Sequence, residues 1–131
     1  MTDCPRDPNP PTTIRSSPPD PYHEDRPWGS FDKFVDNEVC SVKIITVRAA
    51  QKLSLQSHRQ RSEWWIVLDG EMLVEVDGRQ ELKKAGERAF IPVQARHRAV
   101  GLELDCRWLE ISYGHFDEND IERFDDIYGR K

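Results

Sequence analysis

The chain has 131 residues, 37% hydrophobic and 33% charged, which is enough for one domain with a core but not for two. Its net charge of −5 and pI near 5.4 argue against a nucleic-acid partner, because such domains present a basic surface. It shows neither an apolar run of membrane-spanning length nor the apolar region of a secretory signal, so we expect no membrane partner. Cys4, Cys40 and Cys106 form no Cys-x-x-Cys motif or paired framework, which favours the reducing cytoplasm.

Residues 1–25 differ in composition from the rest of the chain. They contain seven of the nine prolines and almost no large apolar side chains. Such a segment cannot bury enough surface to offset its ordering entropy, so we predict a disordered, flexible tail. The composition changes at Arg26, and we place one domain at residues 26–131.

The domain sequence predicts many short strands. Asp69-Gly70 and Asp77-Gly78 read as hairpin turns, because glycine tolerates the positive φ of tight reversals. Short strands between such turns predict an all-β fold, an antiparallel barrel or sandwich, and a jelly roll would hold a site inside it. Runs rich in Val, Ile, Trp and Phe with alternating polarity lie at 30–35, 39–47, 53–57, 63–68, 71–76, 88–91, 99–102 and 107–112.

The last segment has a helical pattern. Apolar residues recur at helical spacing from Ile121 through Phe124 to Ile127. Asp117 could cap the start of a helix and Gly129 could end it. We therefore predict a short C-terminal helix.

Residues 53–63 contain the first half of a candidate metal site. Gln56 and His58 are two residues apart, so in a strand both side chains project to one face while the neighbouring leucines project to the other. Glu63 follows His58 by five residues, a spacing that by itself is more typical of a surface pair than of a metal site. Whether this pair is a metal site therefore depends on a matching set of residues elsewhere in the sequence.

The second half lies forty residues later, at Gly86, Pro92 and His97. With Gly70 closing the first half, the spacing resembles the two-part cupin pattern, in which Gln94 takes a position usually held by glycine. A ligand set of two imidazole nitrogens and two oxygens suits a divalent ion such as Zn, Mn, Fe, Co or Ni. The resemblance implies four metal ligands, with Gln56 in the position of the first His of the pattern: Gln56, His58, Glu63 and His97.

The chain from Arg26 to Arg130 resembles more specifically the cupin domain of type II phosphomannose isomerases. That domain is usually the C-terminal part of bifunctional mannose-1-phosphate guanylyltransferases. The resemblance implies metal-dependent interconversion of mannose 6-phosphate and fructose 6-phosphate. It is carried by Arg26-Pro27-Trp28-Gly29-Ser30, Val42-Lys43, Ile45-Thr46-Val47, the segment from Leu53 to Trp65, Ile91-Pro92, His97-Arg98, and Asp120-Ile121-x-Arg123-Phe124-x-Asp126-Ile127-Tyr128-Gly129-Arg130.

Several positions depart from that family. His is common where Trp64 stands, further His residues where Arg59 and Gln60 stand, Gly at Gln94, and Gln near Ser112. None of these departures removes an implied ligand. The nucleotidyltransferase half of the bifunctional proteins has no counterpart in the sequence, so we expect a stand-alone cupin without guanylyltransferase activity.

An aldose–ketose isomerase needs a phosphate grip and a base. Arg61, Arg98 and Lys43 are the candidate cations for the substrate phosphate, because guanidinium groups bind phosphate bidentately and an ammonium supplies a compact charge. Lys43 is also a candidate catalytic residue. Glu110 could be an inward carboxylate that acts as a base, or could pair with a cation at the barrel rim.

The tryptophans divide into two groups. Trp28, Trp65 and Trp108 are predicted as core residues, since aromatic residues in strands dominate small barrel cores. Trp64 follows Glu63 on the opposite strand face, which places it at a sheet-packing surface or a subunit interface.

Two functions remain open from the sequence. One is a sugar-phosphate isomerase, and the other is a cupin that binds a sugar phosphate or nucleotide sugar without turnover. A metal-dependent oxygenase is a more distant third, because such sites usually prefer a His-rich set to one with Gln. We expect a homodimer in either case.

Overall fold

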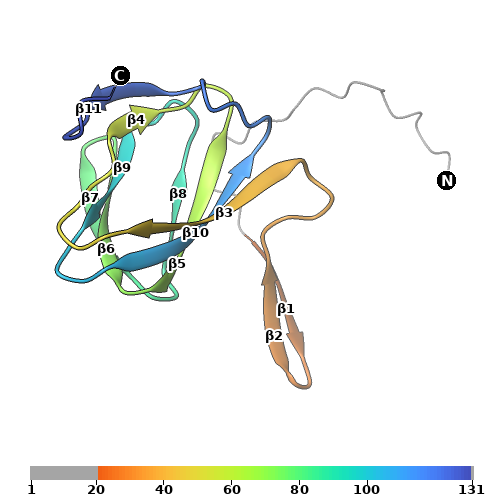
Figure 1. The fold of residues 1–131 in the computed structure, drawn as a ribbon. Helices are drawn as coiled ribbons and strands as arrows, with labels where there is room; N and C mark the ends of the chain where they lie inside the picture. The colour runs from red at the N-terminus through yellow and green to blue at the C-terminus, as the bar shows by residue number, and fades with distance from the viewer. Residues whose placement is uncertain (1–20, 131) are drawn as a thin grey trace, which may run out of the picture.

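The computed structural model describes residues 21–130, which form eleven strands and no helix (Figure 1). The strands are β1 Tyr22–Arg26, β2 Gly29–Lys33, β3 Cys40–Val47, β4 Leu55–Ser57, β5 Ser62–Asp69, β6 Glu71–Val76, β7 Arg79–Lys84, β8 Arg88–Ile91, β9 His97–Gly101, β10 Cys106–Tyr113 and β11 Glu122–Asp125. Because the described residues contain no helix, they contain none that could cross a membrane.

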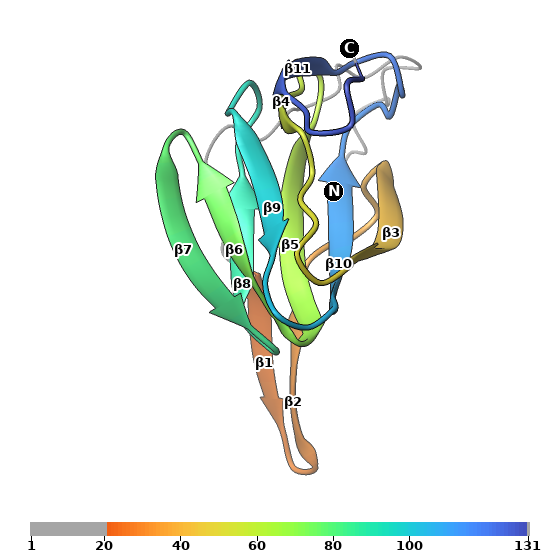
Figure 2. The same cartoon turned by 60° about the vertical axis from the view of Figure 1, so that its left-hand side comes forward.

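Two antiparallel sheets face each other and form a jelly roll (Figures 1 and 2). The four-stranded sheet has the order β3-β10-β5-β8, and the five-stranded sheet has the order β11-β4-β9-β6-β7. β1 and β2 pair only with each other and project from the barrel as a separate hairpin (Figures 1 and 2). The predicted all-β jelly-roll barrel is confirmed.

The core lies between the sheets and follows strand alternation. Trp65 of β5 and Trp108 of β10 are 1% and 0% exposed, with ring centroids 5.0 Å apart. They pack with smaller residues that include Met72, Val74 and Ile91. Burying these large aromatic rings removes extensive apolar surface from water and so stabilises the barrel.

A second apolar cluster covers part of the outer face of the four-stranded sheet. Trp64, Ile111 and Tyr113 are buried there under Phe34 and Val35, which belong to the connection between β2 and β3. Of the two positions predicted for Trp64, a sheet-packing surface or a subunit interface, the structure has a packing surface within the chain. The prediction that Trp28 is a core residue is wrong, because Trp28 lies in the turn of the β1–β2 hairpin and is 74% exposed.

The two predicted turns differ in what they connect. Asp77 and Gly78 both have positive φ, 47° and 83°, and join the paired strands β6 and β7 in a true hairpin. Gly70, with φ of 77°, instead carries the chain from one sheet to the other. A Cβ atom at Gly70 would meet the Asp105 carbonyl oxygen at 2.5 Å, so the close approach requires glycine.

The predicted C-terminal helix is wrong. Asp117 accepts a hydrogen bond from the Asn119 amide in a turn instead of capping a helix. The segment then extends as β11 and pairs with β4. Phe124 and Ile127 stay 36% and 52% exposed, so no apolar helix face is buried, and backbone pairing with β4 decides the local structure.

Eight predicted strands correspond to β2 through β6 and β8 through β10, while β1, β7 and β11 were not predicted. β1 begins at Tyr22, within the range assigned to the tail. The remainder of the predicted tail, residues 1–20, lies outside the described residues. The missed strands are polar, and each lies at an edge or outside the barrel, where strands need little apolar alternation.

Candidate metal centre

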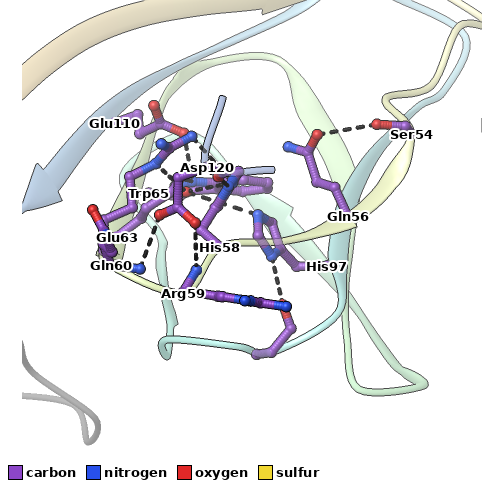
Figure 3. Close-up of polar contacts among 12 residues, drawn as sticks. Ser54, Gln56, His58, Arg59, Gln60, Glu63, Trp65, His97, Glu110 and Asp120 are labelled. Atoms are coloured by element: carbon purple, nitrogen blue, oxygen red, sulfur yellow. Dashed lines mark hydrogen bonds and ion pairs between the residues drawn. The ribbon is translucent and has the colours of Figure 1, made fainter. Parts of the chain in front are cut away.

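Three predicted ligands converge inside the barrel at one end (Figure 3). His58 follows β4, Glu63 is the second residue of β5, and His97 begins β9. Their exposures are 3%, 1% and 1%. Glu63 Oε1 lies 3.3 Å from His58 Nε2 and 3.8 Å from His97 Nε2. Two facing sheets thus bring three ligand-type atoms from distant parts of the sequence to one point.

Hydrogen bonds hold both imidazoles in the same orientation relative to this point. His58 Nδ1 donates to the Asp120 carbonyl at 2.7 Å, and His97 Nδ1 donates to the Ala95 carbonyl at 2.9 Å. With the proton on Nδ1, each Nε2 carries a lone pair directed toward Glu63. Backbone carbonyls that fix the tautomer in this way are typical partners of metal-ligating histidines.

The electrostatics also suit a cation. Burial, followed by the nearby Arg61 charge, lowers the pKa of His58 from 6.5 to about 4, and burial lowers the pKa of His97. Both rings are therefore neutral near pH 7, the form that binds metals. The buried His97 Nε2 has no hydrogen-bond partner among the described residues, and a metal ion would satisfy it. The residues thus fit a divalent ion.

Gln56, the fourth predicted ligand, lies directly across from His97 on the neighbouring strand. Its Oε1 accepts a hydrogen bond from the Ser54 hydroxyl at 3.0 Å (Figure 3). A carbonyl oxygen has a second lone pair, so this contact leaves Gln56 able to bind a metal. The assignment of Gln56 as a ligand stays a prediction.

Glu110 points into the barrel beside this cluster. Its side chain is buried, and the Trp65 indole N–H donates both to Glu110 Oε1 at 3.2 Å and to Glu63 Oε2 at 2.9 Å (Figure 3). Burial, and then the Glu63 carboxylate, raises the pKa of Glu110 to about 9. Of the two sequence-based alternatives, the structure has the inward carboxylate and not the rim ion pair.

Arg61 lies against the cluster, with its side chain buried. Its Nη2 donates to His58 Nε2 at 3.3 Å, and its Nη1 donates to the Asp117 carbonyl at 3.1 Å. Its guanidinium also stacks on Phe116, 4.4 Å from the ring centroid. Lys43 Nζ lies 4.0 Å from the centroid of the same ring. Arg61 and Lys43, two of the cations predicted to bind the substrate phosphate, therefore contact the same ring, and Arg61 also contacts the cluster.

Arg98 is not brought to the site. It follows His97 in β9, so its side chain points to the outer face of the sheet. There it pairs with Glu75 at 3.4 Å and with Asp125 at 3.1 Å. Of the three cations predicted to bind the substrate phosphate, Arg98 therefore lies on the opposite side of the sheet from the cluster.

Comparison with known proteins places the chain in a family. The family model described as "Mannose-6-phosphate isomerase C-terminal" matches residues 21–126. The chain belongs to this family. It is 37% identical over 107 residues to the alginate biosynthesis protein AlgA of Pseudomonas aeruginosa, covering 80% of this chain and 22% of that protein. It is also 37% identical over 109 residues to the mannose-1-phosphate guanylyltransferase ManC of Salmonella typhimurium, with the same coverage.

The chain thus spans about a fifth of the length of these curated relatives. Among solved structures, it matches an uncharacterised protein with a double-stranded β-helix domain from Klebsiella pneumoniae, with a TM-score of 0.59 and 15% identity over 86% of this chain and 91% of that chain. It matches the capsular polysaccharide assembling protein CapF of Staphylococcus aureus with a TM-score of 0.58 and 19% identity over 81% and 34%. These structural matches support the cupin fold.

Asp120 belongs to the segment that carries the family resemblance, but no role in the site was predicted for it. Its carbonyl orients His58, and its carboxylate accepts hydrogen bonds from the Arg59 and Gln60 amides, both at 2.9 Å (Figure 3). It therefore holds the loop between two ligands. No sequence pattern marks such a role, because the fold brings the C-terminal segment to this loop from about 60 positions away.

Asp120→Ala keeps the carbonyl that binds His58 but removes the carboxylate that holds the loop between His58 and Glu63, so it should lower metal affinity by up to about tenfold. Asp126→Ala is the matched control, because the Asp126 carboxylate also accepts from two backbone amides, those of Tyr128 and Arg130, but in the C-terminal turn. Competition with a chelating dye gives the metal Kd of each variant. Equal affinity in wild type and Asp120→Ala would contradict the role of Asp120.

The histidine pKa values predict how the stability of the metal-free protein depends on pH. His58 titrates near 4 in the folded chain and near 6.5 when unfolded, so between these values the unfolded state binds more protons. The histidine contribution to the free energy of unfolding should therefore rise as pH increases from about 4 to 6.5, with His97 acting in the same direction, while the raised pKa of Glu110 contributes in the opposite direction above about 4.5. Urea denaturation in chelator measures the free energy of wild type and His58→Gln, and the difference between the two proteins should increase over this range. An identical pH dependence in both proteins would contradict the assignment.

Proposed function

We propose that the chain is a metal-dependent sugar-phosphate isomerase of the cytoplasm that interconverts mannose 6-phosphate and fructose 6-phosphate. The observation that carries the proposal is the buried His58, Glu63 and His97 cluster, with both Nε2 lone pairs directed to one point. Family membership supports the substrate class. When bound at these three residues and Gln56, a divalent ion would supply a Lewis acid that polarises substrate oxygens.

The protein's own residues would provide the remaining functions. Isomerisation moves a proton between adjacent carbons, so it needs a group that exchanges protons beside the substrate. Glu110 lies inside the barrel next to Glu63, and its raised pKa means that it holds a proton near pH 7. We assign proton transfer to Glu110, with Lys43 on the opposing strand as its cationic neighbour.

Arg61 is our candidate for the substrate phosphate. It donates to the His58 Nε2 lone pair, and a metal ligand needs that same lone pair. Metal binding and this hydrogen bond therefore exclude each other. The Arg61 Nη2 would then be available to an anion while Nη1 keeps its bond to the Asp117 carbonyl. Lys43, which contacts the same Phe116 ring, would supply a second cation.

The alternative is a cupin that binds a sugar phosphate or nucleotide sugar without turnover. The observation that favours it is the engagement of Arg61, which is bound to His58 and the Asp117 carbonyl under Phe116. A coupled assay of the metal-loaded protein with mannose 6-phosphate separates the two functions. Turnover supports the isomerase, and binding without turnover favours the alternative.

Arg61→Ala should reduce kcat/KM for mannose 6-phosphate by roughly ten- to a hundredfold, equivalent to about 1.5–3 kcal/mol, because a charge-assisted and bidentate contact is lost. Arg61→Lys should recover part of the activity, because it keeps the charge but not the planar fork. Unphosphorylated mannose should be a poor substrate that the substitution affects little. Equal losses on both sugars in steady-state kinetics would mean that Arg61 supports the metal loop instead.

A further inference from the structure

Within residues 21–130, the β1–β2 hairpin pairs with no strand of either barrel sheet. It forms a two-stranded sheet of its own, and an isolated two-stranded hairpin is at best marginally stable in water. Figures 1 and 2 show it extending away from the barrel. A surface outside this chain's own barrel would therefore stabilise it.

The hairpin has two different faces. On one face, Tyr22 and Phe31 contact each other with ring centroids 6.4 Å apart, and Lys33 and Arg26 lie over these rings at 5.5 and 5.8 Å. The other face is polar: its His23 binds Asp32 at 2.7 Å and Asp25 at 3.1 Å. The first face also holds Arg26 paired with Glu24 at 3.0 Å, so its apolar area is that of the two rings. We expect these rings to pack against an apolar surface and the His23 face to meet water.

The barrel presents a matching surface. On the outer face of the four-stranded sheet, Val42 and Ile44 of β3 lie opposite Ile111 and Leu109 of β10. Val42 and Ile44 are 58% and 59% exposed, and we call these two residues the open strip. The outer side of a solvated antiparallel strand is normally polar, so an apolar strip on an edge strand marks an interaction surface.

The chain already covers the other part of the same face. Phe34 packs on Trp64 with ring centroids 6.0 Å apart, and its carbonyl accepts a hydrogen bond from the Tyr113 hydroxyl at 2.9 Å. Phe34 directly follows β2, so this anchor also fixes where the hairpin leaves the barrel. The hairpin then extends away from the barrel (Figure 2) and leaves Val42 and Ile44 exposed, so the strip is available to the hairpin of a second copy.

We propose that two copies associate about a two-fold axis, with the aromatic face of each β1–β2 hairpin on the open strip of the other. Each strand of five residues spans about 16 Å, so the hairpin can lie along the eight-residue edge strand β3 and cover Val42 and Ile44. The interface would be isologous, so every contact occurs twice. It is independent of the proposed activity.

The fluorescence of Trp28 should report dimer formation directly. Trp28 is 74% exposed, whereas Trp64, Trp65 and Trp108 are at most 7% exposed, so it is the one solvent-facing member of the chain's four tryptophans. At the hairpin tip it should become buried when dimers form. Diluting the wild type should therefore shift its fluorescence emission to longer wavelength, in step with the dimer-to-monomer transition in sedimentation equilibrium. A Trp28→Phe variant should lose most of this shift.

Ile44→Glu should weaken dimerisation at least about tenfold, because each substitution places a charge in two equivalent apolar contacts. Leu104→Glu is the matched control, since Leu104 is 75% exposed in the β9–β10 connection and should leave the dimer unchanged. Trp28→Ser tests the same interface from the hairpin, away from the barrel core. A wild type that stays monomeric at all concentrations, or a dimer that neither Ile44→Glu nor Trp28→Ser weakens, would overturn the proposal.

Discussion

Replacing His97 with alanine should lower the divalent metal content of the purified protein from about one ion per chain to none. His97 supplies a buried Nε2 with no hydrogen-bond partner in the described residues, held in place through its Nδ1 bond to Ala95. Without this nitrogen, His58 and Glu63 are the only His or acidic ligands left in the cluster. Elemental analysis of wild type and variant measures the change directly.

His58→Ala should have the same effect, while His23→Ala is the control. His23 also binds carboxylates, but it lies exposed on the hairpin away from the cluster. Circular dichroism in chelator should show that all three variants stay folded, because the core of Trp65, Trp108 and their neighbours does not include the metal. Equal metal content in wild type and His97→Ala would show that the ion is held elsewhere.

The sequence predicted the fold well because strand alternation and turn chemistry are local signals. The runs at 71–76 and 88–91 coincide with β6 and β8. Polar strands such as β7 and β11 carry no such signal, since backbone pairing and not apolar alternation forms them. The helix predicted from the spacing of Ile121, Phe124 and Ile127 failed for the same reason.

The metal-ligand cluster, like the strands, was predicted in part. Spacing and resemblance pointed to His58, Glu63 and His97, which the structure brings together. Strand alternation could have excluded Arg98, because it follows the inward His97 in the same strand. The groups that orient the ligands could not be found in this way, since they come from backbone carbonyls and from a distant turn around Asp120.

Trp65 connects the core to the site, and this connection predicts a large difference between two chemically identical substitutions. Trp65 and Trp108 are both fully buried, and their rings pack on each other. The Trp65 indole N–H donates to Glu63 and to Glu110, whereas the Trp108 indole N–H has no hydrogen-bond partner among the described residues. Replacement by alanine should cost about 3–5 kcal/mol of unfolding free energy at either position, as for other large core residues.

Replacement by phenylalanine separates packing from hydrogen bonding. Both phenylalanine variants lose similar ring area, but Trp65→Phe also leaves two buried carboxyl groups without their shared donor. Trp65→Phe should therefore cost about 1–3 kcal/mol more than Trp108→Phe, measured by urea denaturation in chelator. It should also weaken metal binding, because Glu63 loses the bond that fixes its second oxygen, while Trp108→Phe should not. If Trp65→Phe and Trp108→Phe lose equal stability and equal metal affinity, Trp65 contributes only core packing and does not position Glu63.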